Sequence, residues 1–203
     1  MPPSRSTGAT PAEAAPASEL ERAAEAWVAD YFNVRHLLRT RDWVVALTPA
    51  AGTPLRVAAL THDIERRVPG GPKLDPRTQA WDDAGYLREH SERSARMVSE
   101  WLEAQGAAPG VRRAVAALIE RHETGGDTGA DVLQAADSLS FLEVNVDRPR
   151  AWVEEGRCDL AQAQAKLDWT LERIRIPAAR AWAEPLHAQA TAALGTLSER
   201  GGA

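Results

Sequence analysis

The sequence predicts an all-α protein. From Glu19 onward apolar residues recur at helical spacing, and no stretch of useful length shows the strict alternation that is typical of a β-strand. No internal repeat is visible. Residues 1–18 are rich in Pro, Ala, Ser and Thr without a hydrophobic period, which predicts a disordered tail. A length of 203 residues favours one hydrophobic core, so we expect a single helical domain over residues 19–200.

Glycine, proline and the hydrophobic period divide this domain into expected helices. The first extends from Glu19 to about Trp43, and the second from about Pro54 to Arg66, because Pro54 suits a first helical turn. The segment VPGGPKLDPRTQ that follows is too rich in Gly and Pro to continue a helix, which predicts a long surface loop. A further helix is expected to begin at Asp82 as its cap. It and the remaining helices are expected at about 82–104, 109–122, 130–145, 160–173 and 177–197.

Composition excludes several classes of protein. With 24 basic and 29 acidic residues the formal charge is -5, which argues against bulk nucleic acid as a partner. The single cysteine, Cys158, can form neither an intrachain disulfide nor a thiolate zinc cluster. The N-terminus lacks the apolar core of a signal peptide, and no apolar run approaches the roughly 18 residues of a membrane span. We therefore expect a cytoplasmic protein without a membrane partner.

The strongest local signal for chemistry is the dipeptide His62-Asp63 in the segment LTHDIERR. Adjacent residues on a helix point about 100° apart, so the two side chains share one metal only near a helix end. The Gly/Pro-rich loop directly downstream supplies such an end. Taken alone, this dipeptide is a weak signal.

Other metal-ligating residue types interrupt apolar stripes on separate expected helices. They are His36, His90, His122 and Asp137. One histidine on an apolar face is most often an ordinary core residue, and an unpaired carboxylate there costs several kcal/mol. Four histidines with two aspartates form a donor set for Fe, Mn, Mg or Zn. On the residues alone, a metal site and an ordinary helical core stay equally open.

The order of these residues resembles the HD-domain superfamily of metal-dependent phosphohydrolases. The resemblance covers roughly residues 19–145, including the helix ends ADYFNVRH, RHETGGD and LQAADSLSFL, and leaves the helices of residues 160–197 outside. It implies an HD-domain-like helical bundle with two divalent metal ions. The first ion would be held by His36, His62, Asp63 and Asp137. The second would be held by His90 and His122, with Asp63 as the bridge.

The resemblance also implies that a metal-bound hydroxide attacks the substrate. The cations nearest in sequence for binding a small anionic substrate are Arg66, Arg67 and Lys73. A solvated helix end is the alternative for the two arginines. Asp63 is joined in the predicted catalytic set by Glu65 and Glu123, which are expected to relay protons or orient imidazoles, with a surface position as the equal alternative. His187 lies outside the resemblance and is left out of the site.

Three functions remain open when this resemblance is taken into account. The first is a phosphohydrolase or phosphodiesterase acting on a small phosphorylated metabolite or nucleotide. The second is a mixed-valent di-iron oxygenase that cleaves a C–C or C–P bond, and the third is a non-catalytic metal-binding regulatory module. The chain lacks the GYP signature of cyclic dinucleotide phosphodiesterases and the carboxylate pair of guanosine-tetraphosphate hydrolases. Tryptophan excess and Ala-rich C-terminal helices are compatible with a homodimer, and a monomer fits equally well.

Overall fold

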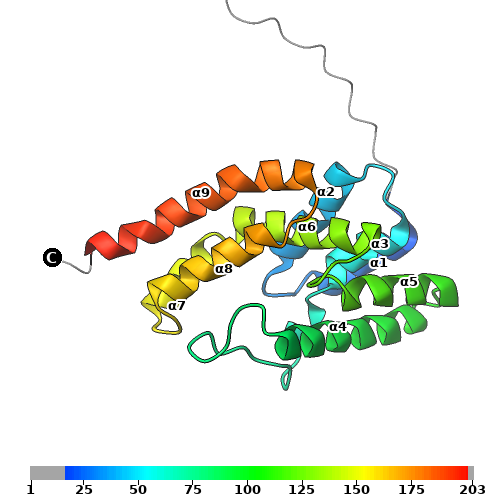
Figure 1. Ribbon diagram of the computed structural model, residues 1–203. Coiled ribbons are helices and arrows are strands. Elements are labelled where there is room, and N and C mark those ends of the chain that lie inside the picture. The colour runs from blue at the N-terminus through cyan, green and yellow to red at the C-terminus, as the bar shows by residue number, and fades with distance from the viewer. Residues whose placement is uncertain (1–16, 201–203) are drawn as a thin grey trace, which may run out of the picture.

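The computed structural model describes residues 17–200, which form helices and loops without a β-strand in that range, so the predicted all-α class is confirmed (Figure 1). The elements are α1 (Glu19–Val28), α2 (Val34–Leu47), α3 (Thr53–Thr61), the 3₁₀ turn η1 (Ile64–Arg67), α4 (Ala84–Ala104), α5 (Pro109–Glu120), α6 (Thr128–Val144), α7 (Asp147–Glu154), α8 (Leu160–Glu172) and α9 (Pro177–Arg200). The predicted tail lies outside the described residues up to residue 16, whereas Ser18 caps α1 by accepting the N–H of Glu21. None of the helices in residues 17–200 is long and apolar enough to cross a membrane.

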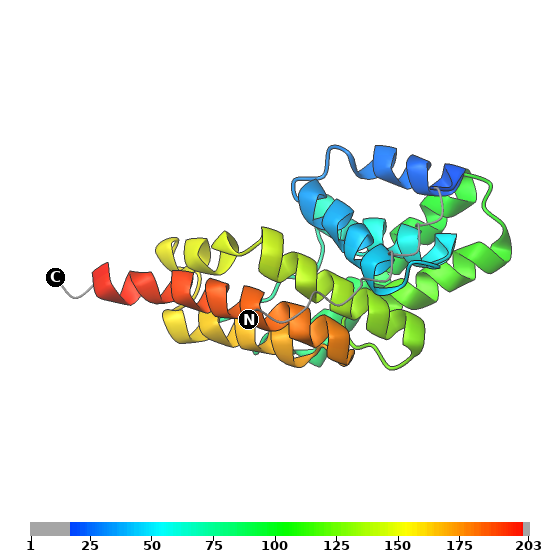
Figure 2. The same ribbon diagram turned by 90° about the horizontal axis from the view of Figure 1, so that it is seen from above.

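Helix α6 is the central element of the fold, because two hydrophobic cores share it (Figures 1 and 2). Its residues Leu133 and Ala136 pack into the core that α1 to α5 build, whereas Leu139 and Leu142 pack into the core of α7 to α9. A helix that is buried on all sides has no continuous polar face. A polar side chain on α6 is therefore forced into the interior, where it must find a partner.

Helices α4 and α5 form an antiparallel pair at one edge of the molecule (Figures 1 and 2). The chain reverses at Gly106, whose φ of 70° is accessible to glycine with little strain. Pro109 then occupies the first turn of α5, where its missing N–H costs nothing. Trp27 of α1 stacks on Trp101 of α4, with 4.6 Å between ring centroids, and closes the first core from the side.

Three differences from the predicted helices matter for the site, and the remaining helix ends agree with the prediction to within three residues. The expected helix from Glu19 to Trp43 is wrong because a turn at residues 29–33 breaks it, and this turn buries Tyr31, whose hydroxyl donates to the backbone carbonyl of Asp63 at 3.2 Å. The expected helix that starts at Pro54 leaves α-geometry after Thr61 and tightens into η1. The third difference is at the start of α4. The cap is Asp83 instead of Asp82, since Asp83 accepts the N–H of Tyr86 at 2.7 Å.

Helix α7 has no counterpart in the sequence prediction. It is only 8 residues long, and Pro149 is its buried residue, so its apolar stripe is too short to produce a periodic signal. Pro149 lies in the first turn, where proline is tolerated because that N–H has no intrahelical partner. The helix lies beside α8 and completes the second core (Figure 1).

Candidate metal centre

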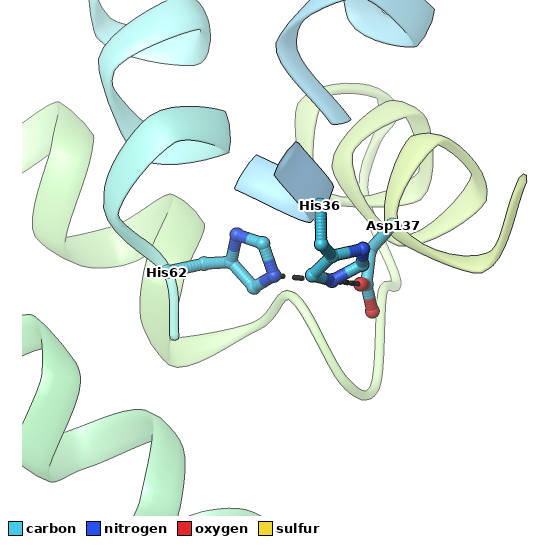
Figure 3. Close-up of side chains that lie close together, drawn as sticks. All are labelled: His36, His62 and Asp137. Carbon is cyan, nitrogen blue, oxygen red and sulfur yellow. Dashed lines mark ion pairs between the residues drawn. The ribbon is translucent and has the colours of Figure 1, made fainter. Parts of the chain in front are cut away.

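Among the polar side chains that α6 carries into the interior, Asp137 is the carboxylate, and two histidines face it (Figure 3). Its Oδ1 lies 3.0 Å from Nε2 of His36 on α2 and 3.4 Å from Nε2 of His62. His62 caps the C-terminal end of α3, where the backbone leaves the α-helix at Asp63. Because the helix ends at this point, the adjacent His62 and Asp63 side chains both reach the same interior region.

A second set of donors continues directly from the first. His90 of α4 places Nε2 3.0 Å from Oδ1 of Asp63. His122 follows the end of α5, and its ring centroid lies 5.2 Å from that of His90 and 5.0 Å from that of His62. Glu123 Oε1 is 3.6 Å from Nε2 of His122 and 3.9 Å from Nε2 of His90. We call these residues the metal cluster: His36, His62, Asp63, His90, His122, Glu123 and Asp137.

The metal cluster contains three overlapping groups of ligand atoms, each with its atoms within 4.8 Å of one another. Two of the groups share His62, and two share His122. The groups are His36 with His62 and Asp137, then His62 with Asp63 and His122, and then His90 with His122 and Glu123. The donors therefore form one continuous array. Glu123 belongs to it, although the sequence pointed to this residue as a proton relay, as a group that orients an imidazole or as a surface carboxylate, and not as a ligand.

All four imidazoles in the cluster are oriented through Nδ1. The acceptors are Ser140 Oγ for His36 at 2.8 Å, the Ala59 carbonyl for His62 at 3.0 Å, Glu65 Oε1 for His90 at 2.8 Å and the Ile119 carbonyl for His122 at 2.7 Å. Carbonyl and carboxylate oxygens only accept, and the Ser140 hydroxyl already donates to the His36 carbonyl at 2.9 Å. Each Nδ1 therefore carries a proton, and each Nε2 presents a lone pair to the cluster when the ring is neutral.

This arrangement fits a cation. The Nε2 atoms of His62 and His122 are buried and have no hydrogen-bond partner within residues 17–200. A nitrogen lone pair that faces a carboxylate is repelled by it. Leaving such a buried lone pair without a partner costs free energy unless a positive charge lies between the nitrogen and the carboxylate. Burial opposes the charged form of His62, but Asp137 and Asp63 outweigh it and raise its pKa to about 8. Nitrogen and carboxylate donors in this number are the ligand set of divalent transition metals.

Arg173, at the C-terminal end of α8, binds the acidic side of the cluster and was missed from the sequence. It donates to both Asp137 and Glu123, and its Nε donates to Ser138 Oγ at 2.8 Å. Burial opposes ionisation of the two carboxyls, but the Arg173 charge holds the pKa of both well below the usual range. The sequence did contain a signal for Arg173, because this residue lies three positions after the buried Thr170 and so on the same face of α8.

Glu65 orients His90 from outside the cluster. It is buried, it accepts the Nδ1–H of His90, and its other oxygen lies 3.6 Å from Nε of Arg93. The loop that follows η1 packs against this carboxylate so closely that a Cβ at Gly71 would lie 2.1 Å from Glu65 Oε2. A larger residue at Gly71 would therefore have to displace the Glu65 carboxylate or the loop that covers this side of the site.

The three cations singled out from the sequence take different positions. Arg66 lies at the edge of the cluster, with Nε 2.9 Å from Asp63 Oδ1 and another nitrogen 2.8 Å from the Tyr86 hydroxyl. Lys73 lines the cavity described below. Arg67 points elsewhere and donates to the Trp27 carbonyl at 3.0 Å. His187, which the sequence left out of the site, pairs with Asp168 of α8 at 2.8 Å.

A cavity of about 450 Å³ opens beside the metal cluster. Part of its lining is the cluster itself, through His36, Asp63, Glu123 and Asp137. The rest comes from η1, from the loop of residues 68–83, and from α4, α6, α7 and α8 with the turn that joins α7 to α8. A cavity of this size takes a small molecule and brings it against the candidate metal ligands.

Comparisons with known proteins agree with this geometry. A family model described as HD domain matches residues 33–168, which is more than half of the chain and includes all seven residues of the metal cluster. No curated protein and no solved structure matches the sequence. Most members of the matched family are metal-dependent phosphohydrolases. The chain belongs to the HD-domain family.

Proposed function

We propose that this protein hydrolyses a phosphate ester of a small molecule with the help of two divalent metal ions. The observation that carries the proposal is the convergence of four imidazole Nε2 atoms and three carboxylates on one side of a cavity of about 450 Å³. Ionised carboxylates and neutral imidazoles favour bound cations, and the cations that line the rest of the cavity favour an anionic substrate.

The overlapping ligand groups suggest how two ions are divided. His36, His62 and Asp137 would hold one ion, and His90, His122 and Glu123 would hold the other. Asp63 lies between them and would bridge the two. When bound, such a pair of ions lowers the pKa of a water molecule and stabilises the oxygens of a phosphoryl group.

The chain's own residues prepare the site for this chemistry. Arg173 keeps Asp137 and Glu123 ionised and therefore available as ligands. We assign Glu123 to metal binding instead of proton relay, because a carboxylate whose pKa lies well below its usual range is a poor proton acceptor. Arg66 pairs with Asp63 and lines the cavity, so its remaining N–H groups are placed to bind substrate oxygens.

Hydrolysis of phosphate esters in the absence of dioxygen tests the proposal, with phosphate measured for monoesters and the released alcohol for diesters. The protein is reconstituted with Mn²⁺ and, separately, with Fe²⁺, and then assayed under argon and in air against a panel of small phosphomonoesters and phosphodiesters. We expect turnover that is equal in both atmospheres and is abolished by a chelator. Activity that requires air would identify the oxygenase instead, and a fully metal-loaded protein that frees neither phosphate from any monoester nor an alcohol from any diester would contradict the proposal.

A further inference from the structure

Some of the residues that line the cavity have no role in the hydrolysis proposed above. Lys166 of α8 lines the cavity and is half-buried among aromatic rings. Its Nζ lies 4.1 Å from the ring centroid of Trp169, 5.2 Å from that of Phe141 and 5.5 Å from that of Trp81. Trp81 and Phe141 also line the cavity, so the amine and the rings form one surface beside the metal cluster.

This aromatic surface is held in place before any ligand arrives. Trp81 comes from the long loop of residues 68–83, and its indole N–H donates to the Gln162 carbonyl of α8 at 2.7 Å. The Gln162 side chain donates back to the Pro76 carbonyl of the same loop at 2.8 Å. Trp81 also stacks on Trp152 of α7, with 5.4 Å between ring centroids and 22° between ring planes. The loop is therefore attached to α7 and α8, and the surface is preorganised.

The ammonium of Lys166 is not neutralised by the surrounding side chains. Within residues 17–200 it has neither an ion pair with a carboxylate nor a hydrogen bond, whereas Arg173 is bound by Asp137 and Glu123. Aromatic faces stabilise a cation but provide no strong acceptor for its three N–H groups. Desolvation, aided by the charge of Arg173, lowers the pKa of Lys166 to about 7. An amine in such surroundings binds an anion favourably, because the anion restores the lost solvation.

Other charges along the cavity favour the same kind of ligand. Lys73, Arg148 and Arg157 line it together with Lys166. The only carboxylates among its described lining residues belong to the metal cluster. If a ligand places a second acidic group in the cavity away from the metal cluster, that group therefore lies near cationic side chains and is not repelled by a neighbouring carboxylate.

We propose that Lys166 is a substrate-binding residue that takes up a second anionic group of the substrate. The substrate class is then a small phosphate ester that carries a further carboxylate or phosphate, with a flat body that packs against Trp81 and Trp152. The identity of the first anionic group, the phosphate at the metal cluster, rests on the proposed function. The second group is inferred from the Lys166 surface itself.

Binding of two non-hydrolysable probes tests this inference. Phenylphosphonate has one acidic group, and 4-carboxyphenylphosphonate has the same ring with a second one. Their dissociation constants are measured by calorimetry on the metal-loaded wild type, Lys166→Met, Lys166→Arg and Arg150→Met. Met keeps the length of the side chain without its charge, and Arg keeps the charge. Arg150→Met removes a partly exposed charge of α7 that does not line the cavity.

We expect the wild type and Arg150→Met to bind the carboxylated probe about tenfold more tightly than phenylphosphonate. Lys166→Met loses this preference, and Lys166→Arg keeps part of it. An unchanged preference in Lys166→Met, or no preference or no binding in the wild type, would overturn the inference. Phosphate release from the corresponding phosphate esters separates the two proposals. Preference without phosphate release rejects only the hydrolysis, and phosphate release without preference rejects only the role of Lys166.

Discussion

Replacing Arg173 by methionine is expected to destabilise the metal-free protein by about 3–5 kcal/mol, because the change leaves two carboxylates buried without their cation. Arg173 is 8% exposed, and Asp137 and Glu123 are 10% and 9% exposed at their side chains. The matched control is Arg175→Met, since Arg175 is 52% exposed and its ion pair with Asp131 is expected to contribute less than about 1 kcal/mol. Urea unfolding of the metal-free variants measures both differences.

The difference in unfolding free energy between the wild type and Arg173→Met depends on pH because of the same ion pairs. Folding lowers the pKa of Asp137 and Glu123, so their contribution to stability is fully present above the unfolded values of about 4 and is lost as the pH falls through the folded values. The gap between wild type and Arg173→Met is therefore expected to narrow below about pH 4. Added metal reduces the gap at neutral pH, because a bound cation replaces the lost arginine. A variant as stable as Arg175→Met would show that Arg173 does not neutralise the cluster.

Replacing Asp63 by asparagine is expected to lower kcat/KM for phosphate release by about 10³-fold, which corresponds to roughly 4 kcal/mol of transition-state stabilisation. Asparagine keeps the size of the side chain but removes the charge that lies 3.0 Å from His90 Nε2 and 2.9 Å from Arg66 Nε. The proposed bridge between two ions is thereby lost. Asp75→Asn serves as the control, since Asp75 lies on the exposed loop and pairs with Arg77.

Kinetics of phosphate release by the reconstituted variants, with metal content determined on the same samples, measure this effect. We expect Asp75→Asn to match the wild type. Retention of more than a tenth of the wild-type kcat/KM in Asp63→Asn would contradict the bridging role.

Helical periodicity was sufficient to find the donors that point into the interior. His36, His90 and Asp137 each interrupt an apolar stripe, and a polar group on a buried stripe needs an interior partner whatever the tertiary arrangement. The side chains of the adjacent His62 and Asp63 face one site because a helix ends there. The Gly/Pro-rich segment predicted this helix end a few residues too far along the chain. The tightening after Thr61 is a tertiary effect, because Tyr31 binds the Asp63 carbonyl from the turn between α1 and α2.

The remaining parts of the site depend on contacts between segments that are distant in the sequence. Glu123 joins the cluster because the turn after α5 places its carboxylate 3.9 Å from Nε2 of His90 on α4 and against Arg173 at the end of α8. Arg173 reaches the cluster from a helix that lies outside the segment with recognisable ligands. Trp81 and Lys166 are 85 positions apart, and only the attachment of the loop to α8 brings them together. Local patterns contain no information on such pairings.

The central claim is that the cluster holds two metal ions, and elemental analysis of protein purified without a chelator tests it most directly. The wild type is compared with the double variant His90→Ala/His122→Ala, which removes two donors of one proposed ion and leaves His36, His62 and Asp137 in place. We expect about two ions per chain in the wild type and about one in the variant. Iron as the bound metal would favour the oxygenase over the hydrolase. A wild type that binds no metal even after reconstitution, or a double variant that keeps both ions, would contradict the assignment.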